Sequence, residues 1–406
     1  MSLSGRPVRA ILRAVAGAAQ RWSDGDFPPR VRLLEKIADR TGYSAPVVEY
    51  ALDRLFFSLD EAALAATIVA ELGSLDVLDR FVERGGLPHA RALPIGRACI
   101  ISSRTTIGVA IVPAVFALCA KCDVLVKDRE DGLVRAFFAT LHEELDELAE
   151  SARAQSWDGE RDAVDLHAYD AVAVFGTDAT IARVRALTRP GARFVAYAAK
   201  ASAGYVGRDA LASEAAAREL AEAAARDVLL YDGEGCLSLH ALFVERGGSI
   251  APERFAALLA AAIERTAIEF PPSRANADSS ARVAAARDLA SFRAAGGTGA
   301  VYSDARASYL AVLDPPLGEP PAFLPRSLAI HSTGSPQEML EYLHAHRLAL
   351  EALALAGVRE ELQAAALASG AARIARFGEL QDPPLGGYHG GRPRIAEFVR
   401  WVTQDA

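Results

Sequence analysis

The sequence predicts an α/β protein, because from Leu93 onward short apolar runs alternate with longer amphipathic stretches, a pattern typical of parallel sheets with helical connections. Strands are expected at residues 97–102, 124–127, 171–175 and 193–198. Helices are expected at about 107–120, 132–153 and 178–188. Residues 1 to about 85 differ, because apolar side chains recur there at spacings of three and four, as in Val8, Ile11, Leu12 and Val15. That spacing predicts a helical region.

A second alternating stretch follows Gly235. Its pattern predicts, in order, a strand at 241–244, a helix near 252–266, a hairpin-like pair around the glycines of 295–300, a strand at 327–331, a long Ala- and Leu-rich helix at 336–356 and a helix near 358–369. The Pro-rich segment 317–324 is expected to be a loop. Because a chain of 406 residues is longer than an ordinary domain with a single hydrophobic core, we expect two or three domains.

The composition excludes several classes of protein. Hydrophobic residues make up 51% and charged residues 24%, which is typical of a globular chain. The 44 Lys and Arg against 52 Asp and Glu give a net charge of -8, the wrong sign for a protein whose main partner is nucleic acid. The longest uncharged apolar run, 105–120, is shorter than the ~20 residues of a membrane span. Four cysteines are too few for a disulfide framework, so we expect reduced thiols in a cytoplasmic protein.

Two motifs that could bind a metal or a phosphate are incomplete. Cys119 and Cys122 have the CxxC spacing, but no second pair or His cluster completes a zinc site, so two packed thiols are the better interpretation. The segment Gly296–Gly299 is not followed by Lys-Ser or Lys-Thr, and a tight turn explains it better than a phosphate loop. No metal site is expected.

Cys236 has a different setting. It comes directly after Gly235, with Gly233 two residues further upstream, and precedes an apolar strand. Glycines at these positions allow a ligand to approach the backbone closely. The local sequence leaves two interpretations open, a buried structural cysteine and a nucleophile.

The order and spacing of several segments resemble those of a known superfamily. The segments are Leu93–Gly96, Ile100–Ile101 before a long apolar helix, Asp123–Glu130, Val172–Thr177, Cys236 and Pro383–Tyr388. In order and spacing they resemble the aldehyde dehydrogenase superfamily, over roughly residues 93 to 401. In that superfamily the first strands line a nicotinamide cofactor and the cysteine is the nucleophile.

Within the superfamily, the helical N-terminal region, the segment Glu234–Ser238, the ending Gly387–Pro393 and the tail Phe398–Trp401 are most similar to the acyl-CoA reductases of the LuxC type. This resemblance implies NAD(P)H-dependent reduction of a fatty acyl thioester, on CoA or on an acyl carrier protein, to the aldehyde. A cysteine thiolate would take the acyl group by thioester exchange, and a hydride would then reduce the acyl-enzyme.

The resemblance also implies a domain organisation. The expected parts are a helical N-terminal region at 1–86, a Rossmann-type nucleotide-binding domain at 87–235, an α/β catalytic domain at 236–375 and a C-terminal return segment at 376–406. The active site would lie between the two domains. The last residues would cross a subunit contact, which implies a homo-oligomer, a dimer or larger, and an acyl-transferring partner protein is a further candidate.

The resemblance assigns candidate site residues. Cys236 would be the nucleophile, and Arg104 would replace the Asn that stabilises the oxyanion, because that Asn would fall at Ser103 or Arg104. The residues expected to bind the cofactor are Ser102, Ser103, Lys127, Glu130, Phe175, Gly176 and Thr177.

One departure from the superfamily bears on the direction of the reaction. Aldehyde-oxidising members carry a Glu, in a Glu-Leu-Gly-Gly-Lys segment, that activates the water for hydrolysis of the acyl-enzyme. The equivalent stretch here, Ala196–Lys200, has no carboxylate. The acyl-enzyme should therefore survive long enough for transfer to or from a thiol. A hydrolytic aldehyde dehydrogenase and a non-catalytic subunit of an acyl-processing complex remain alternatives.

The choice of cofactor stays open on local grounds. Glu130 should repel a 2'-phosphate and favour NADH, whereas Arg129 could pair with that phosphate. The resemblance implies NADPH, which we expect in preference to NADH.

Overall fold

The computed structural model describes residues 3–84, 87–103, 105–129, 132–157, 164–274 and 277–405. The chain divides into two compact units. The first contains residues 1–41, 48–199 and 384–406, and the second contains residues 42–47 and 200–383. Residues 200–235, which the sequence grouped with the nucleotide-binding domain, therefore belong to the same unit as Cys236.

The first unit begins with four helices, α1 (Val8–Ser23), α2 (Pro28–Thr41), α3 (Ala45–Phe57, whose first residues belong to the second unit) and α4 (Glu61–Leu72). The apolar stripe of α1 is buried as its spacing predicts, because Val8, Ile11, Leu12 and Val15 are all at most 1% exposed. The helical region ends before residue 85, since β1 (Val82–Arg84) is a strand.

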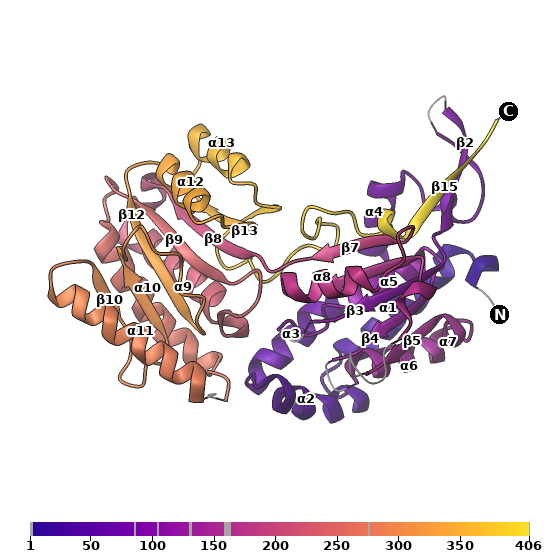
Figure 1. The fold of residues 1–406 in the computed structure, drawn as a ribbon, viewed down its shortest axis with the longest axis horizontal. Helices are drawn as coiled ribbons and strands as arrows, with labels where there is room; N and C mark the ends of the chain where they lie inside the picture. The colour runs from indigo at the N-terminus through magenta and orange to yellow at the C-terminus, as the bar shows by residue number, and fades with distance from the viewer. Residues whose placement is uncertain are drawn as a thin grey trace. The chain divides into compact units, whose positions relative to one another are not determined.

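A five-stranded sheet forms the centre of this unit (Figure 1). Its strands are β3 (Arg97–Ile101), β4 (Asp123–Lys127), β5 (Ala152–Gln155), β6 (Ala171–Phe175) and β7 (Arg193–Tyr197). All pairings are parallel and the order is β5-β4-β3-β6-β7. The connecting helices are α5 (Ile111–Cys119), α6 (Leu133–Glu144), α7 (Leu148–Ser151) and α8 (Asp178–Ala186). The strand order reverses direction at β3, so the crevice outside the carboxyl ends of β3 and β6 is the position where α/β sheets bind ligands.

A smaller antiparallel sheet is built from segments far apart in the sequence. Its strands are β1, β2 (Leu87–Pro94) and β15 (Val399–Gln404). The last strand of the chain pairs along β2 from Val399 opposite Pro94 to Gln404 opposite His89.

The second unit contains a seven-stranded sheet of order β10-β11-β12-β9-β8-β13-β14. The strands are β8 (Ala201–Val206), β9 (Leu239–Glu245), β10 (Ala300–Tyr302), β11 (Leu310–Leu313), β12 (Ser327–Thr333), β13 (Leu350–Ala356) and β14 (Arg373–Ala375). Only the pairing of β10 with β11 is antiparallel. The helices are α9 (Glu214–Leu229), α10 (Pro252–Glu269), α11 (Ala277–Ala295), α12 (Pro336–Ala345) and α13 (Glu360–Ala368).

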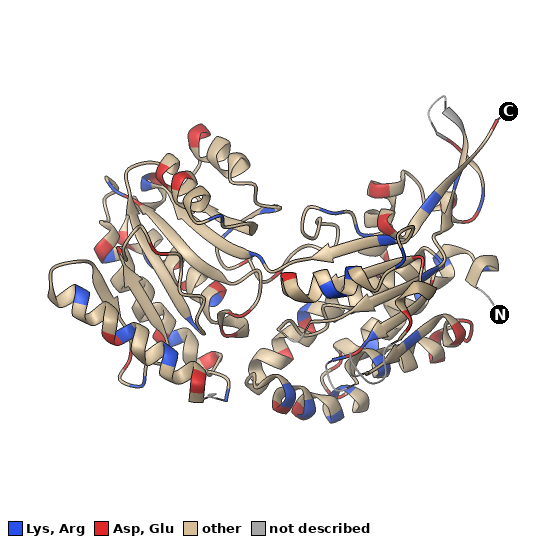
Figure 2. Ribbon diagram, viewed as in Figure 1, with Lys and Arg blue, Asp and Glu red and all other residues tan. Residues whose placement is uncertain are grey.

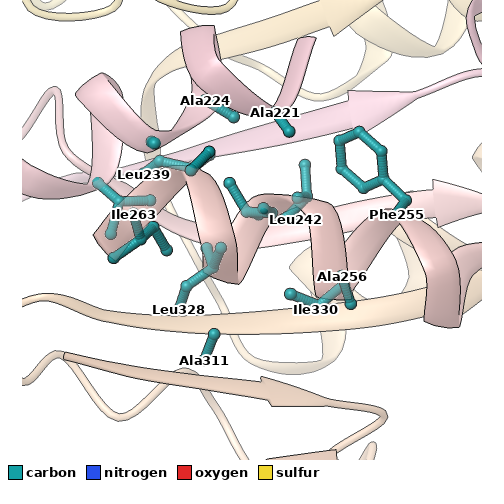
Figure 3. Packing of buried hydrophobic residues seen from close by; sticks show 14 of the residues in the cluster. Ala221, Ala224, Leu239, Leu242, Phe255, Ala256, Ile263, Ala311, Leu328 and Ile330 are labelled. Atoms are coloured by element: carbon teal, nitrogen blue, oxygen red, sulfur yellow. The ribbon is translucent and has the colours of Figure 1, made fainter. Parts of the chain in front are cut away.

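Helices cover both faces of this sheet, and alternate residues of β9 show it. Leu242 and Val244 belong to the core that α9 and α10 cover. Ala241 and Phe243 belong to the core that α12 and α13 cover on the other face. Figure 3 shows the first core, with Ala221 and Ala224 of α9, Phe255 and Ile263 of α10 and strand residues such as Leu328 packed together. Strands buried on both faces read as continuous apolar runs, as β9 does.

Three expected elements are wrong. The single helix at 336–356 is α12 followed by strand β13, because a run such as LEALALA that is buried on both faces looks like a buried helix by periodicity. The glycines of 295–300 do not lie inside a hairpin but lead from α11 into β10, which pairs with β11. The helix at 132–153 ends at Glu144 and is followed by α7 and β5.

Charged residues lie mainly on helices and loops, and the strands of the two large sheets are largely uncharged (Figure 2). The exceptions, such as Lys127 at the end of β4 and Glu351 in β13, therefore need an explanation. Within the described ranges, no helix combines the length and the apolar character that crossing a membrane requires.

Candidate active site

The carboxyl ends of β4, β3 and β6 bring together the expected cofactor residues of the first unit. Lys127 ends β4 and pairs with Ile101 at the end of β3, and Ile101 in turn pairs with Val174 of β6. Lys127 and Phe175 are the last residues of β4 and β6. The residues that follow β3 are Ser102 and Ser103, and those that follow β6 are Gly176 and Thr177. They therefore share the edge of the sheet at which its strand order reverses.

The turn after β6 is built to start a helix. Thr177 is the N-cap of α8, and its hydroxyl oxygen accepts the N–H of Thr180 at 3.3 Å. Gly176 allows the turn to be this tight, because a Cβ there would lie 3.0 Å from the Cγ2 of Thr180. The other N–H groups of the first turn lie at the positive end of the helix dipole, where a phosphate is favoured.

Lys127 is buried for a charged residue, with 8% exposure. Its ammonium lies 4.9 Å from the ring centroid of Trp157, a cation–π distance. The aromatic ring fixes the position of the charge at the end of β4.

Three aromatic rings stack at the ends of β6 and β7. The rings of Phe175 and Tyr197 are parallel within 14° at 4.4 Å, and the ring of His389 lies 4.4 Å from Tyr197. The glycine-rich C-terminal turn that carries His389 therefore packs on the strand ends of the same unit. Sequence reasoning gave Tyr197 and His389 no role, because only the fold brings them to Phe175.

These residues fit a dinucleotide. The parallel sheet, the helix N-terminus after a glycine turn and the lysine at the neighbouring strand end supply donors for phosphate and ribose oxygens. Two expected residues, Arg104 and Glu130, lie outside the described residues. Among the described residues, no group of His, Cys, Asp and Glu could hold a metal ion.

In the second unit, the segment before Cys236 has an unusual backbone. Tyr231, Asp232 and Gly233 all have positive φ angles, of 54°, 51° and 73°. For residues other than glycine this conformation costs about 1–3 kcal/mol each. A Cβ at Gly233 would lie 3.2 Å from the backbone nitrogen of Arg326, so the segment also passes close to another part of the chain.

A buried ion pair holds this segment. The guanidinium of Arg326 donates to the carboxylate of Asp232 and, at 2.8 Å, to the carbonyl of Phe270. The other Asp232 oxygen accepts the N–H of Ser273 at 3.0 Å. Both ionic side chains are at most 4% exposed, so their charges are compensated within the fold.

Further hydrogen bonds fix Cys236 itself. The buried hydroxyl of Ser202 in β8 donates to the carbonyl of Cys236 at 2.8 Å and accepts the N–H of Ala352 in β13 at 3.2 Å. Two residues later, the buried hydroxyl of Ser238 accepts the side-chain amide of Gln381 at 3.0 Å. The thiol thus sits on a backbone tied to two strands and to the segment after β14.

Cys236 differs from the other cysteines in its access to solvent. All four cysteines are free and lie in the described part of the chain. Cys99, Cys119 and Cys122 are wholly buried, which confirms the interpretation of the CxxC pair as packed thiols. Cys236 is half-buried and is therefore the most exposed of the four thiols.

The surroundings of Cys236 favour the protonated form of the thiol. Burial raises its pKa to about 12, and the carboxylate of Glu351 raises it further, whereas Lys200 lowers it. Glu234, the neighbour in sequence, is exposed. The carboxylate that acts on the thiol is therefore Glu351 rather than Glu234.

Lys200 and Glu351 form an ion pair with 3.2 Å between Nζ and Oε2. Lys200 comes directly before β8, and Glu351 is the second residue of β13, which lies beside β8. No role for Glu351 could be predicted from the sequence, because its segment was expected to be a helix. The segment Ala196–Lys200 contains the last residues of β7 and ends directly before β8.

The fold is that of aldehyde dehydrogenases. A benzaldehyde dehydrogenase from Corynebacterium glutamicum is 14% identical, with a TM-score of 0.72 over 100% of this chain and 86% of that one. Aldehyde dehydrogenase 21 from Physcomitrella patens is 10% identical, with a TM-score of 0.70 over 100% and 86%. Glyceraldehyde-3-phosphate dehydrogenase GapN from Methanocaldococcus jannaschii, complexed with NADP, is 12% identical, with a TM-score of 0.68 over 99% and 90%.

The sequence itself identifies the family. Among curated proteins, no sequence matches the chain. The model of the LuxC acyl-CoA reductase family, however, matches residues 3–401, nearly the whole chain. The expected α/β fold and the expected reaction class are both confirmed. The chain belongs to the LuxC family of acyl-CoA reductases, oxidoreductases that reduce fatty acyl-CoA to the aldehyde.

Proposed function

We propose that Cys236 is the nucleophile of acyl-CoA reduction and that NADPH supplies the hydride. The observation that carries the first part is the access to Cys236, the one half-buried thiol beside three wholly buried ones. Its backbone is fixed by the Ser202 hydroxyl, and the preceding segment is fixed by the pair of Asp232 and Arg326. Covalent catalysis on a thioester requires a thiol that is fixed in position and accessible to the substrate.

In the first step, the sulfur of Cys236 attacks the carbonyl carbon of the acyl-CoA thioester. A new carbon–sulfur bond forms, the bond to the sulfur of CoA breaks, and CoA leaves with the proton that Cys236 gave up. The backbone N–H of Cys236 is a candidate donor to the oxyanion, and we propose Arg104 as the second donor.

The second step is the reduction of the acyl-enzyme. When bound, the dinucleotide would supply a hydride to the acyl carbon, and the carbonyl oxygen of the acyl-enzyme would take a proton. The resulting thiohemiacetal then collapses, its carbon–sulfur bond breaks, and the aldehyde leaves as Cys236 regains a proton. The chain's own part is to hold the acyl group on Cys236 and to exclude hydrolysis.

The segment Ala196–Lys200 supports reduction over hydrolysis. It joins β7 to β8 and carries no carboxylate where aldehyde-oxidising enzymes have their water-activating Glu. Without that base, water competes poorly with hydride transfer. Acid as the main product from aldehyde and oxidised cofactor would instead favour the hydrolytic alternative.

For the cofactor, we propose that the first unit binds the dinucleotide and the second carries the acyl group. Ser102, Ser103, Phe175, Gly176 and Thr177 would line its phosphates and nicotinamide end. Lys127 and Glu130 would face the adenosine ribose, and the cation of Arg129 favours the 2'-phosphate of NADPH.

We also propose an assembly and a setting for the reaction. The donor would be acyl-CoA or an acyl carrier protein, with a partner protein that transfers the acyl group as a further candidate. A cytoplasmic homo-oligomer, dimer or larger, is the expected form.

The test compares the full-length protein with the Cys236→Ala variant, on a panel of acyl-CoA thioesters with NADPH or NADH. We expect Cys236→Ala to abolish both aldehyde formation and the acyl adduct detected by mass spectrometry, because no other thiol is reachable. Cys119→Ala is the matched control and should keep both. Full activity of Cys236→Ala would overturn the proposal, and faster turnover with NADH would overturn the choice of NADPH. An unreactive Cys236 in a protein that still binds the cofactor would favour the non-catalytic alternative.

A further inference from the structure

The ion pair of Lys200 and Glu351 stands out among the charged groups of the second unit. Glu351 is 6% exposed although it is a carboxylate in a strand of a buried sheet. A buried charge of this kind is normally retained only with a partner, and Lys200 provides one at 3.2 Å. The pair has no role in the acyl-transfer steps described above.

The backbone shows that the pair belongs to the Cys236 site. The pairing of β13 with β8 is irregular between Leu350 and Ala352, so Glu351 sits at a bulge. Bulges re-aim side chains next to functional sites. The N–H of Ala352, just after the bulge, donates to the Ser202 hydroxyl, which donates in turn to the carbonyl of Cys236.

Two elements thus bring opposite charges to one thiol. Lys200 and Ser202 flank the start of β8, and Glu351 lies at the start of the neighbouring strand β13. The charged groups that act on the Cys236 thiol are Glu351, which raises its pKa, and Lys200, which lowers it. From β14, Arg373 interacts with Glu351 and with the acidic groups behind it, Asp227, Glu379 and Asp382.

We infer that the Lys200–Glu351 ion pair controls the ionisation of Cys236, with Lys200 as the counter-ion of the thiolate and Glu351 as the carboxylate that opposes it. This inference rests on the proposed role of Cys236 as nucleophile. Glu351 is a positioning residue, because it holds the ammonium of Lys200 in place. Its negative charge also offsets part of the effect of Lys200 on the thiol. With the pair intact, the resting thiol stays protonated and is protected from oxidation, which requires thiolate character.

The inference predicts opposite effects for the two partners. Glu351→Gln keeps the size but removes the negative charge, so the field of Lys200 acts on the thiol without the opposing carboxylate, and the pKa of Cys236 should fall by about one unit or more. At a pH below the pKa, the alkylation rate should rise about threefold to tenfold, because a larger thiolate fraction outweighs a lower intrinsic nucleophilicity. Lys200→Met should slow alkylation by a similar factor.

The experiment measures the rate at which iodoacetamide, an uncharged probe, alkylates Cys236 in the full-length protein between pH 7 and 9. Mass spectrometry of the Cys236 peptide gives the site-specific rate. Lys200→Arg keeps the positive charge and should therefore keep the wild-type dependence of the alkylation rate on pH. The alkylation rate of the double variant Lys200→Met/Glu351→Gln should lie between the rates of the two single variants. Asp288→Asn, which removes an exposed carboxylate of α11 outside the pair, should leave the pH profile in place.

Effects in the same direction for Glu351→Gln and Lys200→Met, or no effect of either, would overturn the inference, because a purely structural role predicts one direction. If Glu351→Gln does not fold, Glu351→Asp is the second test, since it withdraws the carboxylate by one methylene and should give a smaller rise. Alkylation requires no turnover. Failure of the proposed function, which would appear as activity in Cys236→Ala, is therefore a separate result.

Discussion

Individual buried residues of the second unit hold the candidate nucleophile in place. Asp232 has a positive φ angle of 51° and would relax without its partners. Arg326 supplies the compensating charge, and its own backbone N–H donates to the carbonyl of Asp232 at 2.8 Å. Buried ion pairs add little net stability compared with apolar residues, so the value of this one lies in fixing a conformation.

Asp227 gives a pH prediction at the residue scale. This carboxylate of α9 is fully buried and accepts the N–H groups of Gly378 at 2.6 Å and Leu380 at 3.1 Å. Burial raises its pKa to about 7, although both N–H donors act in the opposite direction. Between about pH 4 and pH 7 the folded state therefore keeps a proton that the unfolded state releases. Stability should fall by up to a few kcal/mol as the pH rises through this window.

Urea unfolding at several pH values checks this expectation by comparing the wild type with Asp227→Asn, whose side chain stays neutral. As the pH rises, the unfolding free energy of the wild type should fall relative to that of Asp227→Asn. Asp288→Asn, which changes an exposed aspartate of α11, is the control and should show a constant difference. A constant difference for Asp227→Asn as well would contradict the raised pKa.

At the scale of elements, glycines decide how α11 connects to the sheet. Gly297 and Gly299 both have positive φ angles, of 86° and 73°. A Cβ at Gly297 would meet nothing within 4 Å, but a Cβ at Gly299 would lie 2.3 Å from the carbonyl oxygen of Leu313. Leu313 pairs with Ala300 in the antiparallel ladder of β10 and β11. The motif is therefore a tight turn, as its sequence predicts.

This geometry separates two costs that a substitution can incur. Gly297→Ala should lose only about 1 kcal/mol, because of its left-handed backbone. Gly299→Ala should lose about 1–3 kcal/mol more, because the backbone of β11 cannot move away without breaking its pairing. Urea denaturation of both variants gives the comparison. Equal losses would mean that β10 shifts freely, contrary to the described pairing.

At the largest scale, contacts between distant parts of the chain complete the first unit. The carboxylate of Glu71 in α4 accepts the N–H groups of Arg394, Ile395 and Ala396, at 2.5 to 3.0 Å. The guanidinium of Arg193 in β7 donates to three carbonyls of the same segment, those of Ala396, Glu397 and Val399. These two side chains place the chain end so that β15 can pair with β2.

Removal of this anchor should release the C-terminal segment without unfolding the sheet. In Glu71→Ala, three backbone N–H groups lose a charged acceptor, so hydrogen exchange over residues 394–404 should become faster by at least about tenfold. Exchange in β6 should not change. Glu35→Ala, at an exposed position of α2, is the control. Unchanged exchange at 394–404 would show that the pairing with β2 alone holds the segment.

Features that depend on neighbouring residues could be predicted from the sequence. The buried stripe of α1, strands β3, β4, β6 and β7 and the strand-then-glycine turn at Gly176 follow from local periodicity and turn chemistry. The order of short motifs was enough to identify the family, because each motif needs only a few adjacent residues. It also drew attention to Cys236, although its role as nucleophile remains a prediction.

Features that join residues far apart in the sequence became visible in the folded structure. Whether the run LEALALA forms a helix or a strand depends on its burial between two helical layers, and local periodicity carries no such information. The pairing of Lys200 with Glu351, 151 positions further along the chain, depends on β8 and β13 being neighbours in the sheet. Strand order is set by the packing of the whole unit, so the charges around Cys236 emerge only when the sheet is assembled.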